Sequence, residues 1–427
     1  MRILIIGGGG REHTLAWKIS KSPKVGKIFA APGNGGIADI AECVSIGVED
    51  INSLADFAKK ENIDFTIVGP ELPLTLGIVD AFRGKGLRIF GPGKSGAGLE
   101  GSKAWSKEFM ARYNIPTAGF QAFTDKEKAI QFCESQKYPL VVKADGLAAG
   151  KGVVICNDKK EARSALTDFM ENSTLGHAGE LVVIEEFLRG EEISIIAITD
   201  GEAILPLSSA QDHKRIYAND KGPNTGGMGA YSPVPFFNKE LEDKIKKQIL
   251  LPTLQGLKRE EIDYRGVIYF GLIIKDDEPY VLEYNCRFGD PETQAILPRL
   301  KTDLFDLLDA AERKDLSSFL TKNTVSWIDE KSICVVIASG GYPGNYEKWK
   351  EISGLDKLID SENTYVFHAA TVKKDGRHFT NGGRVLGVTA LGNNFKEAHE
   401  KVYKAVEKIN FEKMYYRPDI GWRVVKI

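Results

Sequence analysis

Three polar side chains alternate along one short stretch of the chain and could together handle a phosphoryl group. They are Glu283, Asn285 and Arg287, within the segment Val-Leu-Glu-Tyr-Asn-Cys-Arg-Phe-Gly-Asp-Pro-Glu at 281–292. A spacing of two places all three on one face of an extended strand. Glu283 and Asn285 offer the hard oxygen ligands that Mg²⁺ prefers, and Arg287 could stabilise charge on a transferring phosphoryl group. The alternative is a half-exposed polar strand face.

A glycine-rich loop has the composition of a phosphate cover. It runs from 146 to 152 as Gly-Leu-Ala-Ala-Gly-Lys-Gly and follows a predicted strand that ends near Lys143. Glycine lets the backbone approach phosphate closely and leaves the loop flexible. This is not a Walker loop, since it has no Gly-Lys-Ser/Thr and is followed by a strand, not a helix. The candidate phosphate-binding residues here are Lys143, Gly146, Gly150, Lys151 and Gly152.

The segment 184–192, Ile-Glu-Glu-Phe-Leu-Arg-Gly-Glu-Glu, is a predicted strand that runs into a glycine hinge. Its backbone could hold an adenine ring and one of its carboxylates a ribose diol, as polar groups of a cofactor pocket do. For any one of these acids taken alone, a solvated turn is the preferred explanation.

A first glycine run, Gly7 to Gly10, lies between a predicted strand and a predicted helix, with Arg11 directly after it. Backbone amides at a helix start favour an anion, and arginine adds a fixed charge. A nicotinamide-binding turn is disfavoured, because Glu12 replaces the third glycine of that fingerprint and the second strand ends in Ala-Pro-Gly-Asn without an acid. The phosphate of another ligand is the preferred occupant, and a ligand-free tight turn remains possible.

The elements that position these residues fall into an α/β part followed by α+β parts. Strands are predicted at 2–6, 27–31, 65–68 and 88–90, with helices between them, which indicates a parallel βαβ sheet. Each strand ends in a glycine or proline turn, so ligands are expected at the carboxyl edge of this sheet. Hairpins are predicted at 193–207 and 267–284, and a last α+β unit at 332–427.

Composition narrows the class of protein. The chain has 427 residues and a net charge of -2, so several domains are expected and a basic nucleic-acid surface is not. Its five cysteines are widely spaced without a Cys-x-x-Cys pair, which indicates reduced thiols, not a disulfide framework or zinc site. No apolar run approaches a membrane span or a signal peptide. We therefore expect a cytoplasmic protein with no membrane or nucleic-acid partner.

The motifs together resemble the ATP-grasp superfamily, which has a glycine flap after a lysine-ended strand, a Glu-Glu-x-Leu hinge and a Glu-x-Asn metal strand. Over essentially the whole chain they are most similar to the glycinamide ribonucleotide synthetase family. The segments that carry the resemblance are 7–12, 32–34, 69–71, 146–153, 211–215, 224–233, 285–294 and 381–386. Of these, 211–215 and 285–294 are the most specific.

The resemblance implies ATP-dependent joining of glycine to 5-phosphoribosylamine through glycyl phosphate, in the second step of purine synthesis. The cofactors it implies are ATP and Mg²⁺ or Mn²⁺. The nucleotide-binding residues would be Lys103, Lys143, Gly146, Gly150, Lys151, Gly152, Glu185, Glu186, Leu188 and Glu192, and the metal ligands Glu283 and Asn285. Many ATP-grasp sheets supply a further acid from the adjacent strand, but 266–275 offers none, so the number of metal ions stays open.

The remaining assignments concern the other two substrates. The phosphoribosyl group is expected against Gly8, Gly9, Gly10, Arg11, Asn34, Glu71 and Arg384, although Arg384 could instead form an interdomain ion pair. Asp290 is the candidate for the glycine ammonium group, and Asp212 or Lys214 for the substrate side, beside the phosphoryl-stabilising Arg287. Three alternatives remain: another ATP-grasp ligase or carboxylase of purine synthesis, a nicotinamide dehydrogenase, and a non-catalytic nucleotide-binding module.

The predicted organisation has four parts and a monomeric or weakly dimeric chain. They are an N-terminal βαβ substrate-binding domain at 1–103, an ATP-grasp small lobe with the flap at 104–190, an ATP-grasp large lobe with the metal site at 191–325, and a small C-terminal α+β domain at 326–427.

Overall fold

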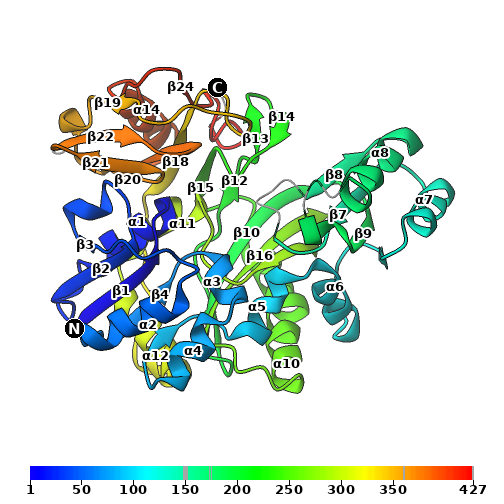
Figure 1. Ribbon diagram of the computed structural model, residues 1–427, viewed down its shortest axis with the longest axis horizontal. Helices are drawn as coiled ribbons and strands as arrows, with labels where there is room; N and C mark the ends of the chain where they lie inside the picture. Colours follow the sequence, from blue (N-terminus) through cyan, green and yellow to red (C-terminus); the bar gives the residue numbers. More distant parts are fainter. Residues whose placement is uncertain (148–151, 173, 175, 359–360, 426–427) are drawn as a thin grey trace.

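A five-stranded parallel sheet opens the chain and forms the blue part of the computed structural model (Figure 1), which describes residues 1–147, 152–172, 174, 176–358 and 361–425. Its strand order is β3 (Glu42–Cys43), β2 (Lys27–Pro32), β1 (Arg2–Gly7), β4 (Phe65–Val68), β5 (Ile89–Phe90). The helices between and after these strands are α1 (Gly10–Ile19), α2 (Ile51–Lys60), α3 (Glu71–Thr75), α4 (Ile78–Gly84) and α5 (Lys94–Gly101). The predicted parallel βαβ sheet is confirmed.

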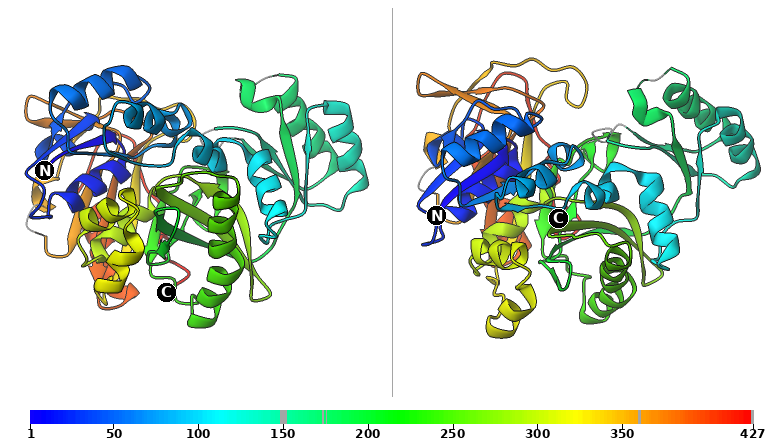
Figure 2. Two further views of the ribbon diagram at one scale, coloured as in Figure 1. Left: turned by 90° about the horizontal axis from the view of Figure 1, so that it is seen from below. Right: turned by 60° about the horizontal axis from the view of Figure 1, so that its bottom comes forward.

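Apolar side chains leave β1 on both faces, so both faces of this sheet are covered. Leu4 and Ile6 share a core with residues of α2 and α4, whereas Ile3 and Ile5 pack with α1. The second face is also covered by α12 (Leu304–Glu312), which comes from much later in the chain and lies beside the blue sheet in Figure 2. A parallel sheet buried on both sides requires such near-continuous apolar strands.

The small lobe is an antiparallel sheet that projects away from the rest of the molecule (Figure 2). Its strand order is β6 (Phe120–Phe123), β9 (Val182–Glu186), β7 (Leu140–Ala144), β8 (Val153–Cys156). Two helices, α7 (Lys126–Ser135) and α8 (Lys159–Met170), share its apolar core, and α6 (Lys103–Arg112) leads into it. Both α7 and α8 start at an aspartate whose side chain accepts from a first-turn amide, as N-caps do.

The large lobe carries a second antiparallel sheet, which contains the predicted hairpins. Its strand order is β11 (Ile204–Pro206), β10 (Glu191–Thr199), β16 (Gly266–Lys275), β17 (Glu278–Asn285). One face is packed by α9 (Lys239–Ile245), a π-helical turn at Lys246–Leu250 and α10 (Leu251–Arg259). The chain then continues through α11 (Glu292–Ile296), α12 and α13 (Leu316–Lys322).

The C-terminal sheet includes two strands, β12 (Gln211–Asp212) and β15 (Gly229–Ser232), from the middle of the chain. Its order is β12, β15, β18 (Lys331–Ser339), β23 (Arg384–Gly392), β20 (Thr364–His368), with β24 (Met414–Tyr415) also paired to β18. Helix α14 (Phe395–Val406) packs on β18 and β23. The smaller elements beside it are β13 (Arg215–Tyr217), β14 (Lys221–Asn224), β19 (Glu351–Ile352), β21 (Thr371–Lys374) and β22 (Arg377–Thr380).

Within the described part of the chain, no helix is long and apolar enough to cross a lipid bilayer.

Candidate active site

A cleft of about 890 Å³ lies where the four parts of the fold meet. It is lined from the N-terminal part by Arg11 and Glu71, from the lobes by residues of α6, β7, β9, β16 and β17, and from the C-terminal part by Arg384. The cleft therefore gathers predicted site residues that lie hundreds of positions apart in the sequence.

The floor of the cleft includes the polar face of β17. β17 ends at Asn285, so the strand carries Glu283 and Asn285 but not Arg287, which was predicted on the same strand. All three side chains nevertheless line the cavity. In the ladder with β16, Glu283 lies opposite Gly271, where an added Cβ would come within 3.0 Å of Glu283 Cγ. Glycine at that position leaves room for the acid to lie across the sheet.

Arg287 is fixed by carboxylates on both sides. Its Nε donates to Glu71 Oε2 at 3.1 Å. Its Nη2 lies 2.9 Å from Glu100 Oε1 and donates to Asn285 Oδ1 at 3.1 Å. Burial would lower the pKa of Arg287, but Glu100 and Glu71 raise it above its usual value. The guanidinium is thus a permanent charge held in one place just after β17.

Lys143 belongs to a buried chain of charges. Glu185 Oε1 lies 2.7 Å from Lys143 Nζ, and Glu185 Oε2 lies 2.8 Å from Lys107 Nζ. Lys107 also donates to Thr117 Oγ1 at 2.7 Å. Burial lowers the pKa of Lys107 to about 8. Because Glu185 is occupied by two lysines, its visible role is to hold Lys143 at the cleft.

Lys103 lies at the start of α6 and points to the base of the glycine flap. Its Nζ donates to the carbonyl of Gly146 at 2.8 Å, and burial lowers its pKa. Gly146 and Gly152 line the cleft. Two other predicted flap residues, Gly150 and Lys151, lie outside the described residues.

The hinge residues separate into three environments. Glu186 is exposed, and Leu188 packs with Ala118 and Ile273 in a small apolar cluster. Glu192 Oε2 lies 2.6 Å from Lys214 Nζ, and Asp212 Oδ1 lies 3.1 Å from the same nitrogen. Asp212 and Lys214 line the cleft, and burial raises the pKa of Asp212 to about 7 although Lys214 opposes that rise.

The first glycine run is organised by Glu12, the residue that replaces the third glycine. Glu12 Oε2 accepts from the Gly9 amide at 2.6 Å, which caps α1, and Glu12 Oε1 lies 2.5 Å from Arg11 Nε. A Cβ at Gly69 would lie 2.1 Å from Glu12 Oε1, so the acid fills the space between the turns. Arg11 reaches the cleft and also donates to the Phe288 carbonyl at 3.0 Å.

Asn34 hydrogen-bonds the N-terminal part of the chain to the C-terminal part. Its Nδ2 donates to the carbonyls of Gly8 at 2.9 Å and His368 at 2.8 Å, and its Oδ1 accepts from the amides of Gly36 and Ile37. Of the residues predicted for the phosphoribosyl group, Arg11, Glu71 and Arg384 line the cleft, whereas Asn34 and the glycines at 8–10 lie beside it.

Arg384, at the start of β23, connects the C-terminal sheet to the turns at Gly226 and Asp290. Its Nη1 donates to the carbonyls of Gly226 at 2.5 Å and Asp290 at 2.8 Å, and lies 3.3 Å from Asp290 Oδ1. Burial would raise the pKa of Asp290, but Arg384 and Arg11 hold it below its usual value. The Gly226 amide in turn donates to the Tyr342 hydroxyl at 3.0 Å.

Comparison with known proteins gives the family. Three models of phosphoribosylglycinamide synthetase match the chain: the N domain over residues 1–100, the ATP-grasp (A) domain over residues 101–293, and the C domain over residues 332–423. The chain belongs to the phosphoribosylglycinamide synthetase family.

Individual relatives of the phosphoribosylglycinamide synthetase family agree over the full length. The phosphoribosylamine–glycine ligases of Caldanaerobacter subterraneus subsp. tengcongensis and Vibrio vulnificus are each 50% identical, over 99% and 100% of this chain and 99% of each relative. A crystal structure of phosphoribosylamine–glycine ligase from Thermotoga maritima is 34% identical, with a TM-score of 0.84 over 98% of this chain and 100% of that one.

The ATP-grasp domain of the family implies ATP together with a divalent metal ion. The Glu283 carboxylate lines the cleft beside Asn285 without an ion-pair or hydrogen-bond partner among the described residues. That part of the chain also contains no group of three or more His, Cys, Asp or Glu side chains able to enclose a metal ion. Mg²⁺ needs only one or two protein carboxylates when phosphate and water complete its shell. The two residues fit such an ion.

Sequence reasoning missed several residues of this site. Lys107 is one helical turn after Lys103, a spacing that would have placed both on one face of α6. Glu100 carried no motif, and Glu292 stood inside a quoted motif without a role; both line the cleft. Tyr269 also lines the cleft, although its strand was considered only as part of a hairpin that offers no further acid.

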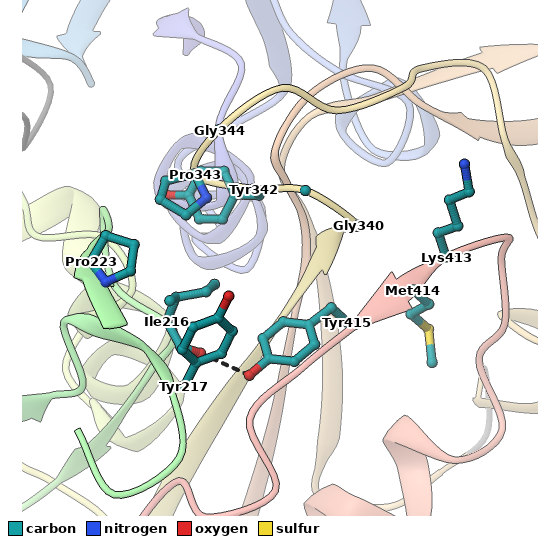
Figure 3. A pocket seen from close by; sticks show the side chains of 11 residues that line it. Ile216, Tyr217, Pro223, Gly340, Tyr342, Pro343, Gly344, Lys413, Met414 and Tyr415 are labelled. Atoms are coloured by element: carbon teal, nitrogen blue, oxygen red, sulfur yellow. Dashed lines mark hydrogen bonds between the residues drawn. The ribbon is translucent and has the colours of Figure 1, made fainter. Parts of the chain in front are cut away.

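A smaller pocket of about 420 Å³ shares the turn Tyr342 to Gly344 with the main cleft (Figure 3). Tyr217 and Tyr415 form another part of its wall, and the Tyr415 hydroxyl donates to the Ile216 carbonyl at 2.9 Å. The turn thus separates two cavities.

Proposed function

We propose that the chain joins glycine to 5-phosphoribosylamine in the cleft, with ATP as the energy source, and releases ADP and phosphate. The observation that carries this proposal is the convergence on one cavity of Lys103, Lys143, Glu283 and Arg287 with Arg11 and Arg384 from the flanking domains. Lys103, Lys143 and Arg287 are suited to a triphosphate. Arg11 and Arg384, in the same cavity, are suited to a sugar phosphate.

In the first step a glycine carboxylate oxygen attacks the γ-phosphorus of ATP, and the bond to the bridging oxygen breaks to give glycyl phosphate and ADP. Lys103, Lys143 and Arg287 stabilise the charge that spreads over the phosphoryl oxygens. Glu283 and Asn285 would hold the metal ion, Mg²⁺ or Mn²⁺, which when bound polarises the phosphate oxygens as a Lewis acid.

In the second step the amine of 5-phosphoribosylamine attacks the acyl carbon. The carbon–oxygen bond to phosphate breaks, inorganic phosphate leaves, and the nitrogen loses a proton as the amide forms. The protein must orient the amine and exclude water, since an acyl phosphate hydrolyses readily. Arg11 and Arg384, which line the cleft from the N-terminal and C-terminal parts of the chain, would bind the sugar phosphate, and Glu71 pairs with Arg287.

An omission assay tests the proposal. ADP release should require glycine and 5-phosphoribosylamine together, and mass spectrometry should detect the amide product. Turnover with bicarbonate or formate in place of glycine would instead favour a carboxylase or another ATP-grasp ligase. ADP release that ignored both substrates would refute the proposal.

A further inference from the structure

Most charged side chains that line the cleft are neutralised by a neighbour of opposite charge. The pairs and groups, each joined within 4.0 Å, are Arg11 with Glu12; Arg287 with Glu71 and Glu100; Lys107 and Lys143 with Glu185; Lys214 with Asp212 and Glu192; and Arg384 with Asp290. Among the described residues of the cleft, Lys103, Glu283 and Glu292 have no such partner.

Two of these three charges are explained by the nucleotide and its metal ion. Lys103 suits a phosphate and Glu283 suits the divalent cation. Glu292 remains. Its side chain is 3% exposed at the first residue of α11, and a carboxylate buried to that degree is costly unless a cation compensates it.

Glu292 is held with one oxygen engaged by hydroxyl groups. Its Oε1 accepts from the Tyr269 hydroxyl at 2.9 Å and from Ser194 Oγ at 3.1 Å. Burial and the charge of Glu292 raise the pKa of Tyr269 well above its usual value, so this hydroxyl stays a donor. Two hydroxyl donors orient the carboxylate but do not neutralise it.

The second oxygen of Glu292 lies against Gly289. A Cβ built at Gly289 would lie 2.6 Å from Glu292 Oε2 and 3.1 Å from the Tyr269 ring. In the part of the chain that the structure describes, this oxygen accepts no hydrogen bond from protein. It is therefore available to a donor that enters with a ligand.

We propose that Glu292 binds the ammonium group of the amino-acid substrate, with Tyr269 and Ser194 as the residues that position it. This inference rests on the proposed function, since a glycine zwitterion must present its carboxylate to the nucleotide and its ammonium group to an acceptor nearby. Asp290 is a poorer acceptor than Glu292, because the guanidinium of Arg384 lies 3.3 Å from its Oδ1 and offsets its charge, whereas Glu292 has no cation within 4.0 Å among the described residues.

Binding of glycine and of glycolate, which carries a neutral hydroxyl in place of the ammonium group, separates charge recognition from general packing. Both are titrated calorimetrically into the full chain with Mg²⁺ and a non-hydrolysable ATP analogue. In Glu292→Gln the Kd of glycine should rise at least ~30-fold, as expected when a buried ionic partner is removed. The Kd of glycolate should stay within about threefold, because glutamine keeps the size and one acceptor oxygen.

Two further variants keep the test decisive. Tyr269→Phe removes one hydroxyl from Glu292 and should weaken glycine selectively, by about threefold or more, even if Glu292→Gln does not fold. Asp290→Asn tests the competing acceptor in the same cleft and should raise the Kd of glycine less than Glu292→Gln does.

The outcomes distinguish this inference from the proposed function. If the unchanged protein forms ADP with glycine and 5-phosphoribosylamine but Glu292→Gln binds glycine normally, or loses glycine and glycolate equally, the assignment of Glu292 is wrong and the function stands. A larger loss in Asp290→Asn than in Glu292→Gln would also overturn it. If the unchanged protein shows no glycine-dependent ADP release, both fail together.

Discussion

Replacing Glu185 by glutamine should destabilise the small lobe more than any neighbouring polar change. Glu185 is 2% exposed and contacts Lys143 at 2.7 Å and Lys107 at 2.8 Å, so solvent ions hardly screen either contact. The substitution keeps the shape of the side chain and removes its charge. The ammonium groups of Lys143 and Lys107 then both lose their carboxylate partner.

The magnitude follows from the two lysines separately. Loss of a buried ionic partner typically costs about 3–5 kcal/mol, which we assign to Lys143. Lys107 has a pKa of about 8 because of burial, and without Glu185 it can lose its proton near pH 7. Its share is then about 1.4 kcal/mol, the value of one pKa unit. We expect a total loss of about 5 kcal/mol.

Hydrogen exchange of peptides from β7 and β9 measures this loss locally, which suits a multidomain chain. Glu186→Gln is the matched control, because its side chain is the adjacent but exposed one, and should change opening by less than about 0.5 kcal/mol. Adding Lys107→Met to Glu185→Gln should restore roughly 1 kcal/mol. Equal protection in the two glutamine variants would refute the account of this charge chain.

Three further predictions concern the cleft and the domain interface. Glu283→Ala or Arg287→Ala should lower kcat at least ~100-fold in a coupled ADP assay, and turnover close to that of the unchanged protein would end the metal-strand assignment. Arg384→Met should raise KM for 5-phosphoribosylamine about tenfold or more, because a phosphate-facing cation is lost, and should speed hydrogen exchange at Gly226, whose carbonyl it binds; an unchanged KM would count against the sugar-phosphate site. Burial lowers the pKa of His13 from 6.5 to about 4 although Asp39 opposes this, so its contribution to stability is complete above pH 6.5 and is lost as pH falls towards 4. The loss approaches about 3 kcal/mol, from 1.36 kcal/mol per pKa unit, and His13→Asn should flatten the fall of the melting temperature over that range; an unaltered pH profile would contradict it.

Features encoded by short-range pattern were predictable from the sequence. Apolar runs followed by glycine or proline turns predicted the parallel strands, and the alternation of Glu283 and Asn285 predicted the polar face of β17. Both signals depend on a period of two or on the backbone freedom of glycine, which a single segment carries by itself.

Features that depend on distant partners were not predictable in the same way. Nothing near Lys107 indicated that Glu185, in another strand, would lie 2.8 Å away. Glu12 counted only as a departure from a nucleotide fingerprint, whereas in the fold it caps α1 and fills the space beside Gly69. The packing of α12 on the first sheet likewise joins residues more than two hundred positions apart.

The pairing of β15 with β18 limits how the protein can be recombined. Residues 229–232 form a strand of the C-terminal sheet. The sheet is therefore not encoded by the C-terminal residues alone and cannot be exchanged as one continuous segment. A chimaera that exchanged only residues 326–427 would have to match a foreign β18 to this β15 or leave a long strand edge open to aggregation. Exchange partners would need to carry the 211–232 segment along with residues 326–427.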